Sequence, residues 1–362
     1  MTSQTSGGAP SRIAVIAGDG IGVEVTEQSV RVLERLVPGR LTFDWFDWGC
    51  HYYTRTGRMM PAEGLDTLRQ YVAILFGAVG WPGVPDHVSL WGLRLAICQG
   101  FDLYANVRPV HFFEGVEGPL RRTDQDRLGW VVVRENTEGE YAGVGGRQFD
   151  SRGDGKAVAV QSAMFTEEGC ERIMRFAFDL ARTRAHKVTS ITKSNAQQYG
   201  MVLWDDVFAS VQRDYPDVAC DSCLVDAMAA RMVLHPESVD VAVGSNLNGD
   251  ILSDLGSALA GSLGLAASAN LDPLRRNPSM FEPVHGSAPD IAGKGIANPV
   301  GAIASAAMML DHLGMAADAA ELMAAIRATL AQGVKTPDIG GRAMTRDIAD
   351  AVIHHLRLPE LT

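Results

Sequence analysis

The sequence predicts an α/β fold with a substantially parallel sheet. Short buried-strand patterns alternate with longer helical patterns along most of the 362 residues, an order typical of βαβ units. Hydrophobic residues make up 46% of the chain and charged residues 21%, as in an ordinary globular enzyme. A chain of this length can form two domains or one large unit with a sizeable core.

The first predicted strand, residues 12–17, runs into the turn Gly18-Asp-Gly-Ile-Gly22 and then into a helical pattern over residues 23–36. The turn has the spacing GxGxG rather than GxGxxG, and no clean second strand ending in an acidic residue follows. It is therefore weak evidence for a Rossmann fold. Further strands are predicted at residues 72–76, 130–133, 187–191 and 239–244, and helices at residues 166–185, 202–213, 226–234, 298–313 and 316–332.

Charge and composition exclude several classes of partner. The net charge is −11, with 32 basic against 43 acidic residues, so nucleic acids and anionic membranes are poor partners. The longest apolar stretch, residues 72–81, is too short to span a bilayer, and residues 1–11 lack the apolar core of a secretion signal. Five scattered cysteines indicate a reducing cytoplasm, and Cys220 and Cys223 are interpreted as ordinary thiols rather than a zinc or redox pair.

Two carboxylates, Asp250 and Asp254, lie four residues apart after the predicted strand at residues 239–244. On a helix this spacing places both on one face. Two adjacent carboxylates repel each other unless water or a cation separates them, and Mg²⁺ or Mn²⁺ prefers such oxygen ligands. Acidic residues also favour helix N-termini for electrostatic reasons, and the pattern alone leaves both interpretations open.

Arginines and proton-transfer groups follow other predicted strands. Arg108 stands before Pro109, and Arg134 lies at the carboxyl end of a strand, positions that suit bidentate binding of a carboxylate. Tyr141 is a candidate acid. Lys193 is a candidate base, because nearby positive charges would lower its pKa. Taken one by one, structural ion pairs, a packed tyrosine and a surface lysine explain these residues equally well or better.

A long loop of small residues over residues 282–298 permits close approach of the backbone to a ligand. Within it, Asp290 could accept hydrogen bonds from a ribose diol and would repel a 2′-phosphate. This residue therefore favours NAD over NADP.

Together these motifs resemble the β-decarboxylating dehydrogenases of the isocitrate/isopropylmalate dehydrogenase family. The stretch Gly80-Trp-Pro-Gly-Val-Pro-Asp-His-Val-Ser-Leu-Trp-Gly92 is similar to the tartrate/D-malate branch. The matching runs span nearly the whole chain in the family's order. They are residues 18–22, 106–109, 133–141, 192–195, 245–247, 249–254, 282–290 and 336–341.

The resemblance implies an isopropylmalate dehydrogenase-like two-domain fold with a large mixed, partly parallel sheet, not a Rossmann fold. Residues 1–103 and 261–362 would form a discontinuous large domain with the NAD-binding loops. Residues 104–260 would form a small domain with metal-binding residues and a dimer arm. It also implies a homodimer whose active sites are shared between subunits.

The same resemblance implies a site. Asp226, Asp250 and Asp254 would bind Mg²⁺ or Mn²⁺, with Asp226 and the base Lys193 coming from the partner subunit and Tyr141 acting as the acid. A K⁺ ion is a further candidate cofactor. Substrate would contact Arg94, Cys98, Arg108 and Arg134, and NAD would contact Glu282, His285, Gly286, Ser287, Ala288, Asp290 and Asn298.

The chain departs from the family pattern on one helix. Cys98 stands where relatives carry a third substrate-binding arginine, and Arg94, one turn earlier, stands where they carry an apolar residue facing the substrate's variable group. We therefore expect poor activity on isopropylmalate and a preference for a polar or anionic group at that place. Ala17 and Asn248 also depart from the pattern.

The expected activity is NAD- and metal-dependent oxidation of an (R)-2-hydroxy acid of the D-malate/tartrate type, followed by β-decarboxylation. Three alternatives stay open: the same chemistry on an unusual anionic acid such as a phosphonate analogue, activity on 3-isopropylmalate, and a non-catalytic regulatory subunit of the same fold. A non-catalytic subunit would not need Tyr141, Lys193 and the three aspartates together.

Overall fold

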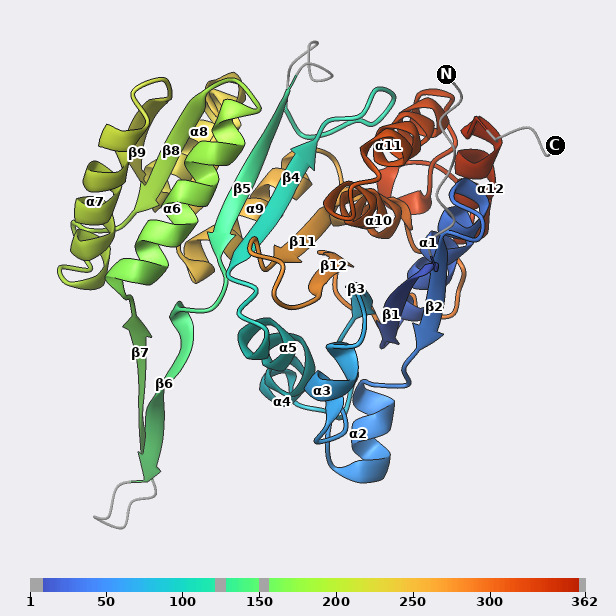
Figure 1. Cartoon of the computed structure of the whole chain (residues 1–362), viewed down its shortest axis with the longest axis horizontal. Coiled ribbons are helices and arrows are strands. Elements are labelled where there is room, and N and C mark those ends of the chain that lie inside the picture. Colours follow the sequence, from blue (N-terminus) through green and yellow to red (C-terminus); the bar gives the residue numbers. More distant parts are fainter. Residues whose placement is uncertain (1–8, 121–127, 150–155, 358–362) are drawn as a thin grey trace.

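A computed structural model describes residues 9–120, 128–149 and 156–357. The predicted α/β class is confirmed: helices cover both faces of one large mixed, mostly parallel sheet, and a two-stranded hairpin projects from the body (Figure 1). The expected absence of a secretion signal concerns residues 1–11, of which 1–8 lie outside the described residues. Among the described helices, none is long and apolar enough to cross a membrane.

The large sheet has ten strands in the order β2-β1-β3-β12-β11-β4-β5-β10-β8-β9. β11 runs antiparallel to both of its neighbours, and β4 runs antiparallel to β5. All other pairs are parallel. Across the sheet the strands are β2 (Leu41–Trp45), β1 (Ser11–Gly18), β3 (Ala73–Ala78), β12 (Ser279–Pro283), β11 (Ala267–Leu271), β4 (Ala105–His111), β5 (Gly129–Glu135), β10 (Val241–Gly244), β8 (Lys187–Thr192) and β9 (Ala219–Leu224).

Every strand and helix that the sequence predicts is present, with ends shifted by three residues or fewer. A π-helical turn, η1 (Leu90–Arg94), joins two short helices that no pattern predicted. The helices are α1 (Ile21–Leu36), α2 (Cys50–Thr56), α3 (Gly64–Leu68), α4 (Asp86–Ser89), α5 (Leu95–Gly100), α6 (Glu167–Arg182), α7 (Gly200–Val211), α8 (Val225–Leu234), α9 (Asn246–Leu259), α10 (Val300–His312), α11 (Ala316–Ala331) and α12 (Thr345–His355).

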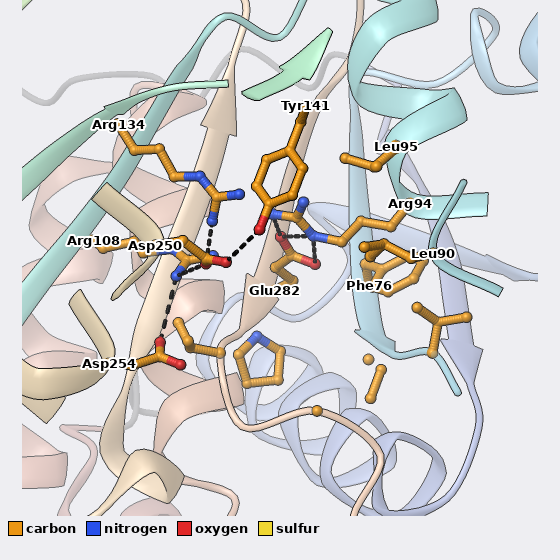
Figure 2. Close-up of a pocket in the computed structure, with 16 residues that line it drawn as sticks. Phe76, Leu90, Arg94, Leu95, Arg108, Arg134, Tyr141, Asp250, Asp254 and Glu282 are labelled. Atoms are coloured by element: carbon orange, nitrogen blue, oxygen red, sulfur yellow. Dashed lines mark hydrogen bonds and ion pairs between the residues drawn. The ribbon is translucent and has the colours of Figure 1, made fainter. Parts of the chain in front are cut away.

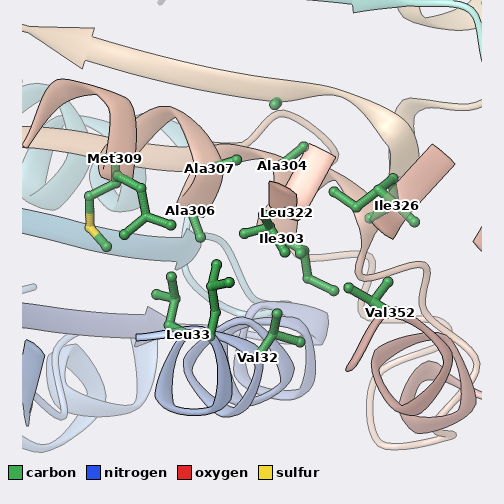
Figure 3. Close-up of a cluster of buried hydrophobic side chains, with 14 of the residues drawn as sticks. Val32, Leu33, Ile303, Ala304, Ala306, Ala307, Met309, Leu322, Ile326 and Val352 are labelled. Atoms are coloured by element: carbon green, nitrogen blue, oxygen red, sulfur yellow. The ribbon is translucent and has the colours of Figure 1, made fainter. Parts of the chain in front are cut away.

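The largest hydrophobic cluster lies where α1, α10, α11 and α12 meet one end of the sheet (Figure 3). α10 is buried along most of its length because Ala304, Ala306 and Ala307 let neighbouring elements approach closely. Larger side chains such as Leu33 and Ile326 fill the space around it. This packing holds in place the part of the sheet that contains β3 and β12, two strands that contribute residues to the candidate site.

The predicted domain division follows the sheet. β1, β2, β3, β11 and β12 come from residues 1–103 and 261–362, while β4, β5, β8, β9 and β10 come from residues 104–260. The border would fall between β11 and β4, which are hydrogen-bonded neighbours within one sheet. Two separate domains stay a prediction.

The hairpin of β6 (Gly139–Phe149) and β7 (Ala157–Met164) extends away from the large sheet (Figure 1). Val158, Val160 and Met164 alternate along β7, and Val144 pairs opposite Ser162, so these four apolar side chains share one face. All four are exposed. An exposed apolar face of this kind is typical of a surface that contacts another chain.

Candidate active site

A cavity of about 250 Å³ lies between the two halves of the sheet (Figure 2). β3 and η1 form one wall, β12 and the loop after it form another, and β4, β5 and α9 close the side opposite η1. Its polar lining consists of Arg94, Arg108, Arg134, Tyr141, Asp250, Asp254 and Glu282. The structure thus brings together in one cavity seven residues that the sequence analysis chose for four different roles.

Asp250 and Asp254 lie one turn apart on α9, as their spacing predicts. The helix begins at Asn246, where the Ser245 hydroxyl accepts a bond from the backbone of Asn248, so neither aspartate is the helix cap. Asp254 Oδ1 is buried, lacks a hydrogen-bond partner among the described residues and lies 3.6 Å from Arg108 Nη1. Burial raises the pKa of Asp254, an effect that Arg108 partly offsets.

These two carboxylates suit a hard divalent cation, which takes oxygen ligands and keeps several waters. The orphaned Asp254 oxygen is the observation that supports the fit, because a buried acceptor without a partner costs free energy. No cluster of three or more His, Cys, Asp or Glu side chains that could hold a metal occurs within the described part of the chain. A third protein ligand would therefore come from outside this cavity.

Arg108 and Arg134 reach Asp250 from adjacent strands. Arg108 Nη1 donates to Asp250 Oδ1 at 2.9 Å and to Ser253 Oγ at 2.8 Å, and Arg134 makes a close ion pair with the same Asp250 oxygen. Burial, followed by the charge of Arg108, lowers the pKa of Arg134. Two buried guanidinium groups that share one carboxylate oxygen leave room for a further anion, as expected for a carboxylate-binding site.

Tyr141, on β6, closes the cavity above Asp250. Its hydroxyl donates to Asp250 Oδ2 at 3.3 Å, and its ring lies 5.4 Å from the Arg134 guanidinium. Burial and the Asp250 charge raise the pKa of Tyr141. The hydroxyl therefore keeps its proton at neutral pH, as its predicted role as an acid requires.

The structure revises the expectation for Arg94 and Cys98. Arg94 lines the cavity, but its guanidinium is paired with Glu282, which the sequence analysis placed against NAD. Cys98 is fully buried and does not line the cavity, and burial raises the pKa of its thiol to about 11. The Cys98 thiol therefore lies behind the cavity wall in this structure, and its contact with substrate stays a prediction.

Lys193 and Asp226 lie outside the cavity. Lys193 follows β8 and Asp226 is in the first turn of α8, where Lys193 Nζ lies 2.5 Å from Asp226 Oδ1. Their side chains are 28% and 66% exposed, and Lys193 lowers the pKa of Asp226. Within one chain the structure does not bring this pair to Asp250 and Asp254.

The loop predicted to bind NAD borders a second cavity of about 730 Å³ next to the first. Gly286 and Ser287 line it opposite residues 79–86, and a Cβ on Gly286 would meet no atom within 4 Å. His285 Nε2 is buried without a hydrogen-bond partner among the described residues, and Ala288 has a positive φ of 37°. This open, glycine-bearing wall gives a ligand room to approach the backbone.

The two ends of the predicted NAD loop differ. Asp290 is exposed, as binding a ribose diol would require. The Asn298 side chain is buried, and it donates to Asp338 and accepts from the backbone of Val300. These bonds tie Asn298 to the start of α10, and its contact with NAD stays a prediction.

Sequence reasoning missed the role of Asp19 in the glycine-rich turn. Its buried carboxylate accepts hydrogen bonds from the backbone of Cys50 at 2.8 Å and of Gly80 at 3.0 Å. Gly20 has a φ of 59°, and a Cβ there would lie 2.0 Å from the carbonyl oxygen of Ser287. The turn therefore contacts both walls of the second cavity. Its glycines predict that another backbone segment approaches closely, but they do not reveal which segment.

Fold and cavity together match a known class of dehydrogenases. The family model for isocitrate/isopropylmalate dehydrogenase matches residues 12–352, and the chain belongs to this family. A probable tartrate dehydrogenase/decarboxylase from Agrobacterium vitis is 55% identical over 346 residues, 94% of each chain. The D-malate dehydrogenase (decarboxylating) of Escherichia coli (strain K12) is 47% identical over 352 residues, 94% of this chain and 97% of that relative.

Solved structures agree with these relatives. The crystal structure of isocitrate dehydrogenase from Methylococcus capsulatus matches with a TM-score of 0.87 and 36% sequence identity, covering 96% of this chain and 99% of that one. The predicted family and fold class are thereby confirmed.

Proposed function

We propose that this protein oxidises an (R)-2-hydroxy dicarboxylate of the D-malate/tartrate type with NAD and a divalent metal, and then removes the β-carboxylate as CO₂. The observation that carries the proposal is the single cavity in which two arginines, a protonated tyrosine and the Asp250–Asp254 pair converge (Figure 2). The names of the relatives from Agrobacterium vitis and Escherichia coli support the substrate type.

The charge of the cavity favours a dianionic substrate. Its lining carries three positive side chains, Arg94, Arg108 and Arg134, and three negative ones, Asp250, Asp254 and Glu282, which balance. A divalent cation on the aspartates would leave an excess of two positive charges, which a dicarboxylate neutralises. A tricarboxylate or a phosphonate analogue would bury excess negative charge that no positive side chain of the cavity balances, which is costly.

In the proposed reaction Arg108 and Arg134 bind a substrate carboxylate and orient C2. Asp250 and Asp254 would hold the metal, which would supply polarisation of the C2 oxygen and stabilisation of enolate charge, and bound NAD would supply the acceptor for the hydride. Tyr141 then gives its phenolic proton to the carbon that has lost CO₂. Its raised pKa keeps that proton available.

Lys193 and Asp226 would enter this chemistry from a second subunit. In one chain they pair with each other outside the cavity. Lys193 of the partner subunit would take the C2 hydroxyl proton, and Asp226 of the partner subunit would complete the metal site. The exposed apolar face of the hairpin supports a homodimer, because such a face is costly in water.

NAD would occupy the second cavity, where Gly286 and Ser287 leave the backbone accessible. Of the side chains expected to contact it, Asp290 is free to accept from the ribose, whereas Asn298 is engaged elsewhere.

The test is NADH formation with a panel of 2-hydroxy acids, with Mg²⁺ or Mn²⁺ and after chelation. We expect metal-dependent NADH and CO₂ in equal amounts from D-malate or a tartrate, and little from a tricarboxylate or a phosphonate analogue. Absence of turnover on every acid, with the folded dimer intact, would favour a non-catalytic subunit and overturn the proposal.

A further inference from the structure

Arg94 on η1 and Glu282 on β12 form a closed ion pair that joins two walls of the cavity (Figure 2). Arg94 Nε donates to Glu282 Oε1 at 2.8 Å and to Oε2 at 3.1 Å, and its Nη2 lies 2.7 Å from Oε1. Only 10% and 6% of the two side chains are exposed. Asn270 braces the pair, donating to Glu282 Oε1 at 2.7 Å and accepting from Arg94 Nη2 at 3.3 Å.

The pair is electrically neutral but retains two unused groups. Arg94 Nη1 has no hydrogen-bond partner among the described residues, although both residues line the cavity. Glu282 Oε2 accepts only the longer bond from Arg94 Nε, and a carboxylate oxygen has capacity for a second. The cavity wall therefore carries one charged donor and one charged acceptor with unused hydrogen-bonding capacity.

We propose that Arg94, held by Glu282, determines specificity by binding a hydroxyl on C3, the carbon next to the one oxidised. A hydroxyl both donates and accepts, so it matches the two unused groups, whereas an anionic substituent would meet the Glu282 carboxylate. An apolar substituent would desolvate Arg94 Nη1 and Glu282 Oε2 without giving either a new hydrogen-bond partner, which is unfavourable. This inference rests on the proposed function and narrows its substrate to a 2,3-dihydroxy dicarboxylate.

The test compares substrates that differ only at C3: D-malate and the two tartrate stereoisomers with an (R)-2-hydroxyl. The parent should prefer one tartrate isomer, and the double variant Arg94→Met with Glu282→Met should lose that preference. The expected fall in the ratio of kcat/KM for tartrate to that for D-malate is about ten- to a hundredfold, the range for a hydrogen bond to a charged group.

Replacing both partners leaves no unpaired buried charge, and Asn270 keeps its bond to the Met280 carbonyl. The matched control is Arg12→Met with Asp44→Asn, which removes an exposed ion pair between β1 and β2 and should leave the ratio unchanged. An equal loss for both substrates would overturn the proposal. So would a rise in the KM for NAD alone, which would mean that the pair binds the nicotinamide carboxamide.

If the double variant does not fold, the substrate preference of the unmodified protein tests the proposal instead. A tartrate isomer should then exceed D-malate in kcat/KM, and 3-isopropylmalate should be the poorest of the three. Preference for D-malate or for 3-isopropylmalate would overturn the role of Arg94 while leaving the proposed dehydrogenase intact. Failure of the dehydrogenase itself would appear instead as no NADH from any acid.

Discussion

The cavity around Asp250 and the pair formed by Lys193 and Asp226 contain the same kinds of groups in opposite surroundings. In the cavity, buried arginines and carboxylates converge and one aspartate oxygen lacks a partner. In the Lys193–Asp226 pair the lysine is half-buried and the aspartate exposed, and the two charges satisfy each other. This difference is what the proposed shared site requires, in which each chain carries two incomplete parts of one site.

Surface features near the exposed pair agree with this interpretation. Leu234 at the end of α8 and Tyr199 before α7 are 69% and 82% exposed, large values for side chains of this kind. Exposed side chains of this kind, like the apolar face of the hairpin, are typical of surfaces that contact another chain. The predictions below test whether the two parts act as one site.

The largest expected effect is loss of the metal. Asp254→Asn and Asp226→Asn should each abolish turnover and lower Mn²⁺ affinity by more than the roughly hundredfold that loss of an outer partner costs. Calorimetric titration of Mn²⁺ into the dimer measures this. Asp217→Asn, at an exposed carboxylate paired with Arg182, is the control. If Asp226→Asn left the Mn²⁺ affinity unchanged, Asp226 would not be a ligand of the metal, and the cavity and the Lys193–Asp226 pair would not form one site.

Next in size is removal of the proposed acid. Tyr141→Phe should lower kcat by about 10²- to 10⁴-fold, the usual contribution of general acid catalysis. Because the pKa of Tyr141 is raised, the required protonated form persists at pH values where an ordinary tyrosine ionises, and it is lost as pH rises through that pKa. A kcat profile from pH 7 to 11 should show an alkaline fall in the parent. The same fall in Tyr141→Phe would assign it to another group.

A change in the hairpin should prevent dimer formation without altering any residue of the cavity or of the Lys193–Asp226 pair. Val158→Asp with Val160→Asp places two charges on the exposed hairpin face. Burying them between subunits is costly, so we expect folded monomers with little or no turnover. Ultracentrifugation and circular dichroism measure assembly and folding. A fully active monomer would show that one chain suffices.

The smallest expected effect concerns Asp19, which belongs to neither part. Asp19→Asn turns one accepting oxygen into a donor facing the backbone N–H of Cys50 or Gly80. We expect a loss of about 1–3 kcal/mol in the free energy of unfolding and a severalfold rise in the KM for NAD. The KM for the 2-hydroxy acid should hardly change. An effect on that KM alone would place Asp19 nearer the substrate cavity than the structure does.

Local patterns predicted much of the fold and the charged half of the site. The apolar run at residues 12–17 and the i,i+4 spacing of Asp250 and Asp254 encode a buried strand and a helix face directly. Strands β11 and β12 were missed because each has only five residues, with small residues in β11 and Glu282 and Pro283 in β12. They are held in the sheet by pairing with each other and with β3 and β4.

Contacts between residues that are distant in sequence could not be predicted. Arg94 was expected to face the substrate with a free charge, but Glu282, 188 residues away, neutralises it. Nothing in the spacing around Arg94 reveals that contact, which depends on η1 packing beside β12. For the same reason the sequence could not show that Asp19 bridges α2 and the loop at residues 79–86.

Mixing two inactive variants tests the shared site most directly. Lys193→Ala removes one part and Asp250→Asn the other, so a mixed dimer has one cavity with both parts intact. After subunit exchange, activity should recover to about a quarter of the parent value, because half the dimers are mixed and half their cavities are complete. Asp250→Asn mixed with Asp254→Asn should stay inactive. No recovery despite demonstrated exchange would contradict the account.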